Sequence, residues 1–147
     1  MKALFTAICF FAATSFFGQQ TIFGKWKTID DETGKPKSIV EIYEKSGKVY
    51  AKIIHIIEAE NRNRVCENCE GDDKNKPILG MVIIRGLTKD GSEYNGGKIL
   101  DPKNGKSYKC NISLETKDKL KIRGYIGFSL IGRSQYWIRV DESKKTQ

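Results

Sequence analysis

The stretch SYKCNISLE at residues 107–115 decides the fold, and KLKIRGYI at residues 119–126 repeats its pattern. In both stretches apolar or small residues alternate with polar ones, which is typical of a β-strand with one buried face and one solvated face. Lys117 and Asp118 between them supply a turn. The two stretches therefore predict an antiparallel hairpin, with Cys110 packed in the core as a small hydrophobe.

Further segments of strand length continue this pattern in both directions, with turn signals such as Asp90-Gly91 between them. The Gly96-Gly97 pair predicts a bulge or a sharp corner. We expect strands at residues 24–29, 37–44, 48–57, 79–87, 94–100, 107–115, 119–126 and 133–140. Most connections are of hairpin length. This favours an all-β fold, an eight-stranded antiparallel up-and-down barrel, over a Greek-key sandwich; such a barrel holds side chains alone or one small ligand.

Residues 1–18 have the pattern of a cleavable export signal, because Lys2 precedes an apolar run at residues 3–17. The expected organisation is a signal peptide at 1–18 and a single barrel domain at 19–147, periplasmic or secreted. The apolar run is too short to span a bilayer, and no later segment is long enough. Cys9 lies inside the run rather than at its end, which argues against a lipid anchor.

The chain is basic, with a formal net charge of +8. Its lysines are interleaved with acidic residues along the whole sequence, so we expect a solvated outer face rather than a binding patch. Lys121, Arg123 and Tyr125 loosely fit the interleaved basic and aromatic residues of an oligonucleotide-binding barrel, but export argues against such a role, so we expect no nucleic-acid partner.

Cys66 and Cys69 lie in a polar stretch at residues 58–76 that is unlike a strand. In an oxidising compartment they can form a structural disulfide, which is the interpretation we favour. A redox dithiol and a metal site are the alternatives. A structural zinc site needs four ligands and the chain has one histidine, His55, so no metal or cofactor is expected. A redox dithiol would be expected at a strand-to-helix turn, and no such pattern surrounds the pair.

The last expected strand carries two rows of different chemistry. One row is Arg133, Gln135, Trp137 and Arg139, and the other is Ser134, Tyr136, Ile138 and Val140. If the apolar row points inward, the arginines are ordinary surface charges. If the arginine row points inward, the arginines need anionic partners. These partners are either internal, from Asp30, Asp31 or Asp101, or a carboxylate or phosphate of a ligand.

Gly24-Lys25-Trp26 resembles the Gly-x-Trp signature of lipocalin and calycin barrels. The resemblance implies that Trp26 plugs one end of the barrel beneath a basic residue of the last strand, for which Arg139 is the candidate.

A second resemblance covers nearly all of the chain after the export signal. Its segments are Asp30 to Gly34 with Ser38, Cys66 to Gly71, Gly97 to Pro102, Gly105 to Tyr108, Arg123 to Gly127 and Gly132 to Arg139. They resemble a family of small exported bacterial proteins known as a domain of unknown function, family 2147. The resemblance implies a lipocalin-like barrel and brings no activity or catalytic residues.

These patterns predict an exported lipocalin-like protein that binds a small, partly apolar, anionic ligand in the barrel. The candidate ligand-binding residues are Trp26, Tyr125, Arg133, Gln135, Trp137 and Arg139. The alternative is a packed barrel that acts as an interaction module for an envelope protein or a second copy, through the cysteine loop or an exposed face of the last strand.

A third hypothesis is a weak enzyme that uses His55 or the dithiol. Because His55 falls in an apolar row with Val49, Ala51 and Ile53, we expect it in the core. No catalytic triad or carboxylate pair emerges from the spacing, so we do not expect an enzyme.

Overall fold

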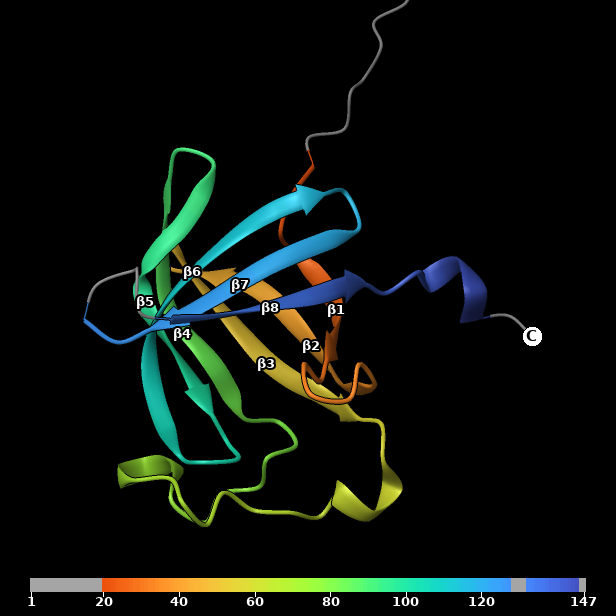
Figure 1. Cartoon of the computed structure of the whole chain (residues 1–147), viewed down its shortest axis with the longest axis vertical. Helices are drawn as coiled ribbons and strands as arrows, with labels where there is room; N and C mark the ends of the chain where they lie inside the picture. The colour runs from red at the N-terminus through yellow and green to blue at the C-terminus, as the bar shows by residue number, and fades with distance from the viewer. Residues whose placement is uncertain (1–19, 128–131, 146–147) are drawn as a thin grey trace, which may run out of the picture.

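The computed structural model describes residues 20–127 and 132–145, and the expected export signal at 1–18 lies outside them (Figure 1). Eight antiparallel strands form a closed barrel in which each strand pairs with its neighbour in the chain and the first pairs with the last. The strands are β1 (Gly24–Ile29), β2 (Pro36–Lys45), β3 (Lys48–Ile56), β4 (Val82–Asp90), β5 (Glu93–Asp101), β6 (Lys106–Thr116), β7 (Lys119–Tyr125) and β8 (Gly132–Arg139). The expected up-and-down barrel is confirmed, and the register shift between Tyr94 and Gly97 confirms the expected irregularity in β5.

The barrel is closed by β1 and β8, where Trp26 pairs with Arg139 and Thr28 pairs with Trp137. Because partners in an antiparallel pair point to the same face, these four side chains share the interior. The arginine row of β8 therefore faces inward, and Tyr136 and Ile138 of the other row face outward and are exposed. This register decides between the two orientations that the sequence left open.

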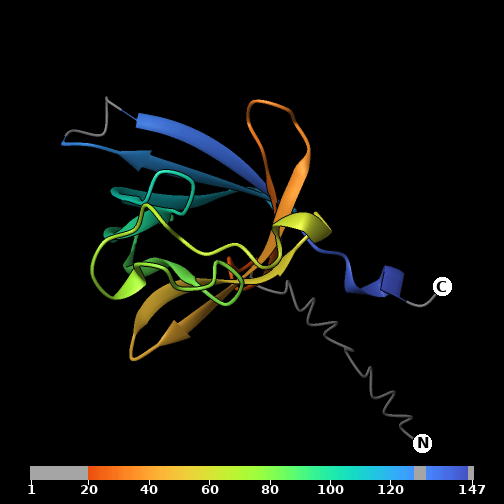
Figure 2. The same ribbon diagram turned by 90° about the horizontal axis from the view of Figure 1, so that it is seen from below.

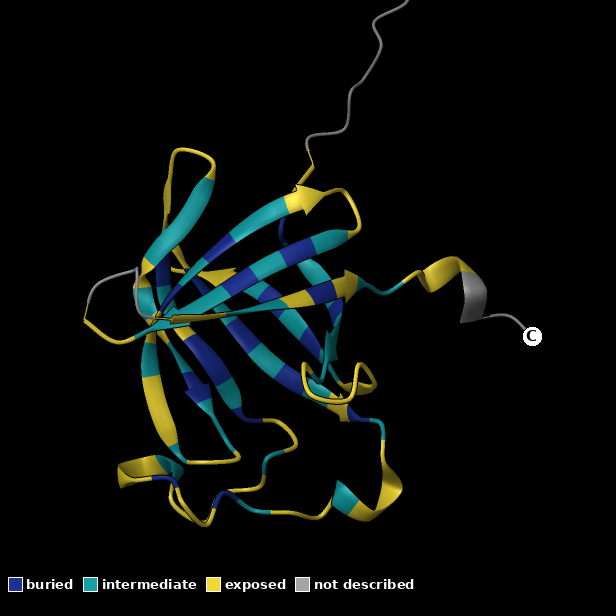
Figure 3. Cartoon of the chain, in the orientation of Figure 1, coloured by how far each residue is buried: buried dark blue, intermediate teal, exposed yellow. Residues whose placement is uncertain are grey.

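Buried residues recur along the strands of the barrel (Figure 3), and those that do not line the cavity described below fill one end of it. The packed end contains Ile22, Trp26, Val40, Ile42, Val49, Ala51, Ile84, Leu87, Cys110, Ile112 and Leu120. The expected burial of Cys110 is thus confirmed. The β2–β3, β4–β5 and β6–β7 turns and the N-terminal segment lie at this closed end. The other end of the barrel is the open end.

The expected position of His55 in the core is wrong. Ile39 of β2 pairs with His55, but its neighbour Val40 pairs with Ile53, so Ile54 is an extra residue in β3. Such a bulge reverses the alternation beyond it. His55 is consequently exposed, and Ile56 takes the inward position.

Strand β4 begins later than expected, at Val82 rather than Leu79. Leu79 and Gly80 form a turn closed by a hydrogen bond from Met81 N to Ile78 O, and Gly80 has a φ of 89°, a left-handed conformation that glycine adopts without steric strain. Two bonds still tie this segment to β3, because Gly80 N donates to Ile53 O and Ile53 N donates to Met81 O. At the other end β4 continues through Asp90 to its hairpin.

A long loop at residues 57–81 connects β3 to β4 and runs beside the open end of the barrel (Figure 2). It contains two short 3-10 helices, η1 (Ala59–Asn61) and η2 (Gly71–Asp73). A third, η3 (Glu142–Lys145), follows β8. Within the described residues, no helix has the length and apolar character needed to cross a membrane.

Candidate functional site

The open half of the barrel contains a cavity of about 740 Å³. Small-molecule sites usually have volumes of roughly 300–1,000 Å³. The cavity opens among the β1–β2, β5–β6 and β7–β8 connections and the 57–81 loop, all of which contribute lining residues. The barrel is thus packed at one end and hollow at the other, which is the arrangement of a container with a single open end.

The wall of the cavity is mostly aliphatic. Its buried or half-buried aliphatic members are Ile29, Ile53, Ile56, Ile78, Ile83, Ile99, Leu100 and Ile122. They come from strands on several sides of the barrel, and Ile78 comes from the 57–81 loop. A molecule that enters the cavity therefore exchanges water for an apolar surface, which is favourable for the apolar part of a ligand.

A group of polar side chains interrupts this wall where β1, β2 and β8 meet. The hydroxyl oxygens of Thr28 and Ser38 lie 2.7 Å apart and form a hydrogen bond. Gln135 and Trp137, two successive inward residues of β8, also line the cavity. The interior therefore offers hydrogen-bonding groups on one side and hydrocarbon on the others.

Charged residues are confined to the mouth. Arg133 at the start of β8 forms an ion pair with Asp31 in the β1–β2 connection. Nearby, Lys37 Nζ lies 3.4 Å from Asp30 Oδ2. Over the described lining, four carboxylates face four cations, namely Asp30, Asp31, Glu58 and Asp101 with Lys37, Arg64, Lys103 and Arg133. The mouth is therefore polar but has no excess of positive charge.

Asp30 also organises the β1–β2 turn. Its Oδ1 accepts hydrogen bonds from the backbone N–H groups of Thr33 and Glu32, each at 2.9 Å, and one from the Thr33 hydroxyl. The Thr33 N–H is the main cause that lowers the pKa of Asp30 to about 2. An ionised Asp30 therefore holds the turn that presents Asp31 to Arg133.

Arg139 lies at the closed end of the barrel, outside the cavity lining. Its guanidinium carbon is 4.1 Å from the ring centroid of Trp26. The guanidinium also donates to the carbonyl oxygens of Lys117, Phe23 and Thr21 at 2.7, 3.2 and 2.7 Å. The expected packing of Trp26 beneath Arg139 is confirmed, and the pair closes the end of the barrel by joining the N-terminal segment to the β6–β7 turn.

The six expected ligand-binding residues thus separate into two groups. Tyr125, Arg133, Gln135 and Trp137 line the cavity, whereas Trp26 and Arg139 are absent from its lining. The alternation of β8 placed all four of its inward residues on one face but could not show where along the strand the packing ends. Contributions from Arg64, Asn61 and Glu58 were not expected, because the sequence does not show where a long loop folds back.

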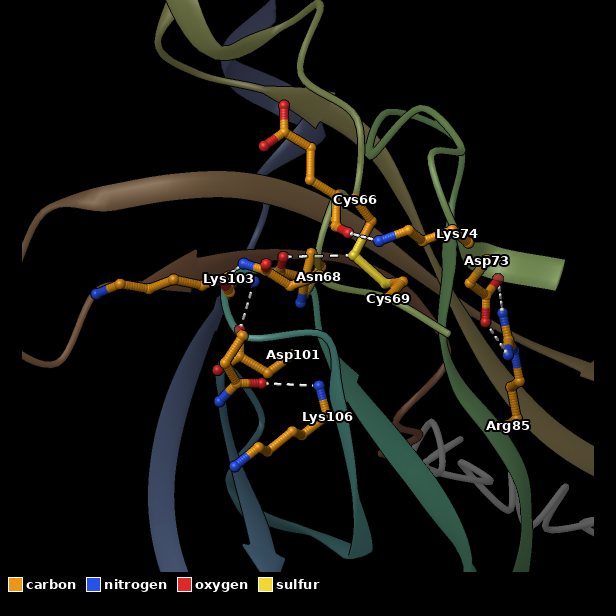
Figure 4. The surroundings of a disulfide bond; sticks show 12 residues. Cys66, Asn68, Cys69, Asp73, Lys74, Arg85, Asp101, Lys103 and Lys106 are labelled. Carbon is orange, nitrogen blue, oxygen red and sulfur yellow. Dashed lines mark hydrogen bonds and ion pairs between the residues drawn. A yellow bond between two sulfur atoms is a disulfide. The ribbon is translucent and has the colours of Figure 1, made fainter. Parts of the chain in front are cut away.

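The expected disulfide between Cys66 and Cys69 is confirmed. Both cysteines are buried, and their loop packs against the β5–β6 turn (Figure 4). Asn68 Nδ2 donates to Lys103 O at 3.2 Å. The contact is so close that a Cβ on Gly105, whose φ is 73°, would lie 1.9 Å from Asn68 O. The disulfide therefore fixes the part of the loop that borders the mouth.

A second attachment holds the same loop to the barrel wall. Arg85 of β4 donates to both carboxylate oxygens of Asp73 in η2, at 2.7 and 2.8 Å, in a bidentate pair (Figure 4). The hydrogen bond from Arg85 lowers the pKa of Asp73. A forked contact of this kind fixes direction as well as distance, so the loop has a defined position on the barrel.

The remaining chemically reactive groups do not converge on the cavity. Cys110 is a free thiol in the packed half, and burial raises its pKa to about 12. His55 is exposed on the outer face. Across residues 20–127 and 132–145, no group of three or more His, Cys, Asp or Glu side chains is arranged to hold a metal ion.

The sequence of the barrel matches a known protein family. A family model described as "Uncharacterized protein conserved in bacteria (DUF2147)" matches residues 24–139. The chain belongs to this family. The match runs from the first residue of β1 to the last residue of β8, so the DUF2147 region is the whole barrel.

A solved structure has the same fold as this DUF2147 protein. It is described as protein HP1028 from the human pathogen Helicobacter pylori, which belongs to the lipocalin family. The two share 22% sequence identity with a TM-score of 0.74, over 84% of this chain and 86% of the other. The likeness shows a lipocalin-like fold. No curated protein matched the sequence.

Proposed function

We propose that this DUF2147 protein binds a small, partly apolar molecule in the open half of its barrel. The observation that carries the proposal is the cavity of about 740 Å³, which has an aliphatic wall, a group of polar side chains and one mouth. Lipocalin-like barrels of eight strands are wide enough to hold one small ligand. With no cluster of catalytic groups facing the cavity within the described residues, we assign it binding and release.

The charge that the site can accept depends on the ion pair between Arg133 and Asp31 at the mouth. The sequence favoured an anionic ligand anchored by Arg133 and Arg139, but Arg139 serves the closed end. Arg133 is already paired with Asp31. We propose that an anionic group, where the ligand has one, stays at the mouth and replaces Asp31 on Arg133. The apolar body then occupies the interior.

We further propose that the protein acts outside the cytoplasm, in the periplasm or as a secreted protein. Lys2 and the apolar run at residues 3–17 support export through a cleavable signal. The N-terminal sequence of the protein recovered from its host tests this. A start near Gln19 or Gln20 is the expected result, whereas a start at Met1 contradicts cleavage.

The test of binding is native mass spectrometry of the protein purified from its host, followed by denaturing extraction. We expect a reproducible small-molecule adduct. The matched variants are Gln135→Trp, which adds a ring inside the cavity, and Tyr136→Trp, which changes the adjacent, outward-facing residue. Loss of the adduct in Gln135→Trp alone supports the cavity as the site. Equal adducts in both variants place the molecule elsewhere and overturn the proposal.

A second candidate is an interaction module, and one observation favours it. Tyr136 and Ile138 on the outer face of β8 are 37% and 40% exposed. An apolar strip of this kind could pack against an envelope protein or a second copy of the chain. Light scattering of the wild type and of Ile138→Lys tests the second copy, since a dimer that uses this face dissociates in the variant. This candidate assumed a solidly packed barrel, whereas the barrel contains a cavity of about 740 Å³.

A further inference from the structure

Three neighbouring strands of the barrel, β7, β8 and β1, are described in full and contain no acidic residue (Figure 1). The acids that flank them in the sequence, Asp30, Asp118 and Asp141, lie beyond the strand ends. Interleaving of the two charges along the chain therefore does not extend to the outer face of these strands, which we call the basic panel. Its outward-facing cations are Lys25, Lys27, Lys119, Lys121 and Arg123.

The centre of the basic panel is apolar. Tyr136 and Ile138, on the outer face of β8, are 37% and 40% exposed. In the register of the sheet, Lys121 lies opposite Tyr136. Ile138 lies between Lys119 of β7 and Lys27 of β1. Lys119 Nζ also lies 4.4 Å from the ring centroid of Tyr136. Two exposed apolar side chains are thus framed by lysines on both sides.

The protein neutralises only some of these lysines. Lys25 and Lys119 each form an ion pair with a glutamate, at 2.6 and 3.6 Å. Among the described residues, no carboxylate lies close enough to Lys27 or Lys121 to form an ion pair. These two lysines lie on opposite sides of β8, next to its apolar pair. The panel therefore attracts an anionic partner at the place where its apolar side chains are exposed.

This combination of groups suits an anionic bilayer surface. The negative potential of such a surface attracts lysines, and aromatic and aliphatic side chains enter the boundary between headgroups and acyl chains. Two partly exposed apolar side chains cannot form the core of a standard protein interface, which buries roughly 800 Å² per partner. Charge must therefore supply most of the attraction. Lipid headgroups can gather beneath lysines at any spacing, whereas a folded partner must present its carboxylates at matching positions.

We propose that the basic panel docks the protein on a membrane surface that contains anionic lipids. Tyr136 and Ile138 enter the headgroup region, and Lys27 and Lys121 lie among the lipid phosphates. The inference goes beyond ligand binding and does not need the cavity, because every residue that carries it lies on the outer face of the barrel.

The test is co-sedimentation of the purified protein with vesicles of phosphatidylcholine, either alone or mixed with phosphatidylglycerol. The wild type should bind the mixed vesicles and not the neutral ones. Added salt should weaken this binding, because it screens charges at a surface. Lys27→Glu combined with Lys121→Glu should weaken binding by about tenfold or more, since each lysine near an anionic surface contributes a factor of roughly five.

The matched control is Lys48→Glu combined with Lys89→Glu. It makes the same change in net charge at exposed lysines of β3 and β4, outside the basic panel. Ile138→Ser tests the apolar centre and should weaken binding to the mixed vesicles several-fold. Thermal unfolding shows whether each variant is folded. Lys27→Gln combined with Lys121→Gln, which removes the two charges without adding acids, carries the test if the reversed variant does not fold.

Loss of vesicle binding in the panel variant, with binding retained in the control, supports the proposal. Equal losses in the two double variants would show that net charge rather than the panel attracts the vesicles, and would overturn it. Absence of wild-type binding to the mixed vesicles also overturns it. So does a preference for soluble polyglutamate over the vesicles, since the partner would then be an acidic polypeptide. None of these outcomes affects the assignment of the cavity.

Discussion

Asp31 and Arg133 form an ion pair at the mouth of the barrel, and this pair joins the β1–β2 connection to the start of β8. The two residues are about a hundred positions apart in the sequence. They meet because β1 and β8 are neighbours where the barrel closes. The pair lies on the rim of the cavity. It therefore places a carboxylate at the position on Arg133 that we propose for the anionic group of a ligand.

This pair predicts opposite effects for two substitutions. Asp31→Asn frees Arg133 and should strengthen binding of decanoate several-fold, whereas Arg133→Ala should weaken it. Binding of 1-decanol, which has no charge, should change little in either variant. Isothermal titration calorimetry measures all of these. If decanoate and 1-decanol respond alike, Arg133 does not contact a ligand anion.

Arg139 is predicted to stabilise the fold and not to contact the ligand. Arg139→Ala removes three charge-assisted hydrogen bonds and the contact with Trp26. We expect a loss of roughly 2–4 kcal/mol in the free energy of unfolding. Urea denaturation measures the loss. The control is Lys25→Ala, which removes an exposed ion pair with Glu142 and should cost little. A lower affinity without a lower stability would contradict this assignment.

The disulfide is predicted to order the loop at the mouth. A clip across so few residues contributes about 2 kcal/mol by the chain-entropy relation. Replacing Cys66 and Cys69 by serine should lower the unfolding free energy by about this amount and speed hydrogen exchange in residues 58–81. Gly105→Ala, which displaces Asn68, should loosen the same loop with the disulfide intact. Unchanged exchange in both variants would show that other contacts hold the loop.

The lowered pKa of Asp30 predicts that the folded protein loses stability in acid. Its pKa is about 2 in the folded protein against an ordinary value of 3.8, so the unfolded chain binds the proton more tightly. The stabilisation is fully present above about pH 4 and disappears as the pH falls toward 2. Urea midpoints measured from pH 6 to pH 2 should therefore fall less steeply in Asp30→Asn than in the wild type. Parallel curves would show that another carboxyl dominates.

The alternation along the chain was sufficient to predict the strands and the barrel. Their boundaries agree within one residue except in β4, where Gly80 takes a left-handed conformation. Each strand buries one face, so apolar and polar residues alternate along it, and this alternation can be recognised from the sequence of that strand alone. The error at His55 has a different origin, since a bulge of one residue leaves almost no mark on composition yet reverses every later side chain.

The candidate site was predicted only in part. Tyr125, Arg133, Gln135 and Trp137 line the cavity as their strands suggested, but the partner of Arg133 comes from a turn about a hundred residues earlier. The fold-back of Asn68 onto Gly105 is also a long-range contact. The sequence offered Asp31 as one of three candidate partners of the arginines but could not choose among them, and it contained no signal for the contact of Asn68 with Gly105, because both contacts depend on the closed barrel.

The separation of the barrel into a packed end and a hollow end has a consequence for re-engineering. Thr28, Ser38, Ile99 and Gln135 contact the hollow, while the ring of Trp26 and the fork of Arg139 close the far end. Effects of substitutions at well-separated sites are nearly additive. Substitutions at those four positions should therefore leave the contribution of the Trp26–Arg139 closure to stability unchanged, so the hollow end can be redesigned for other molecules while the closed end continues to hold the barrel together.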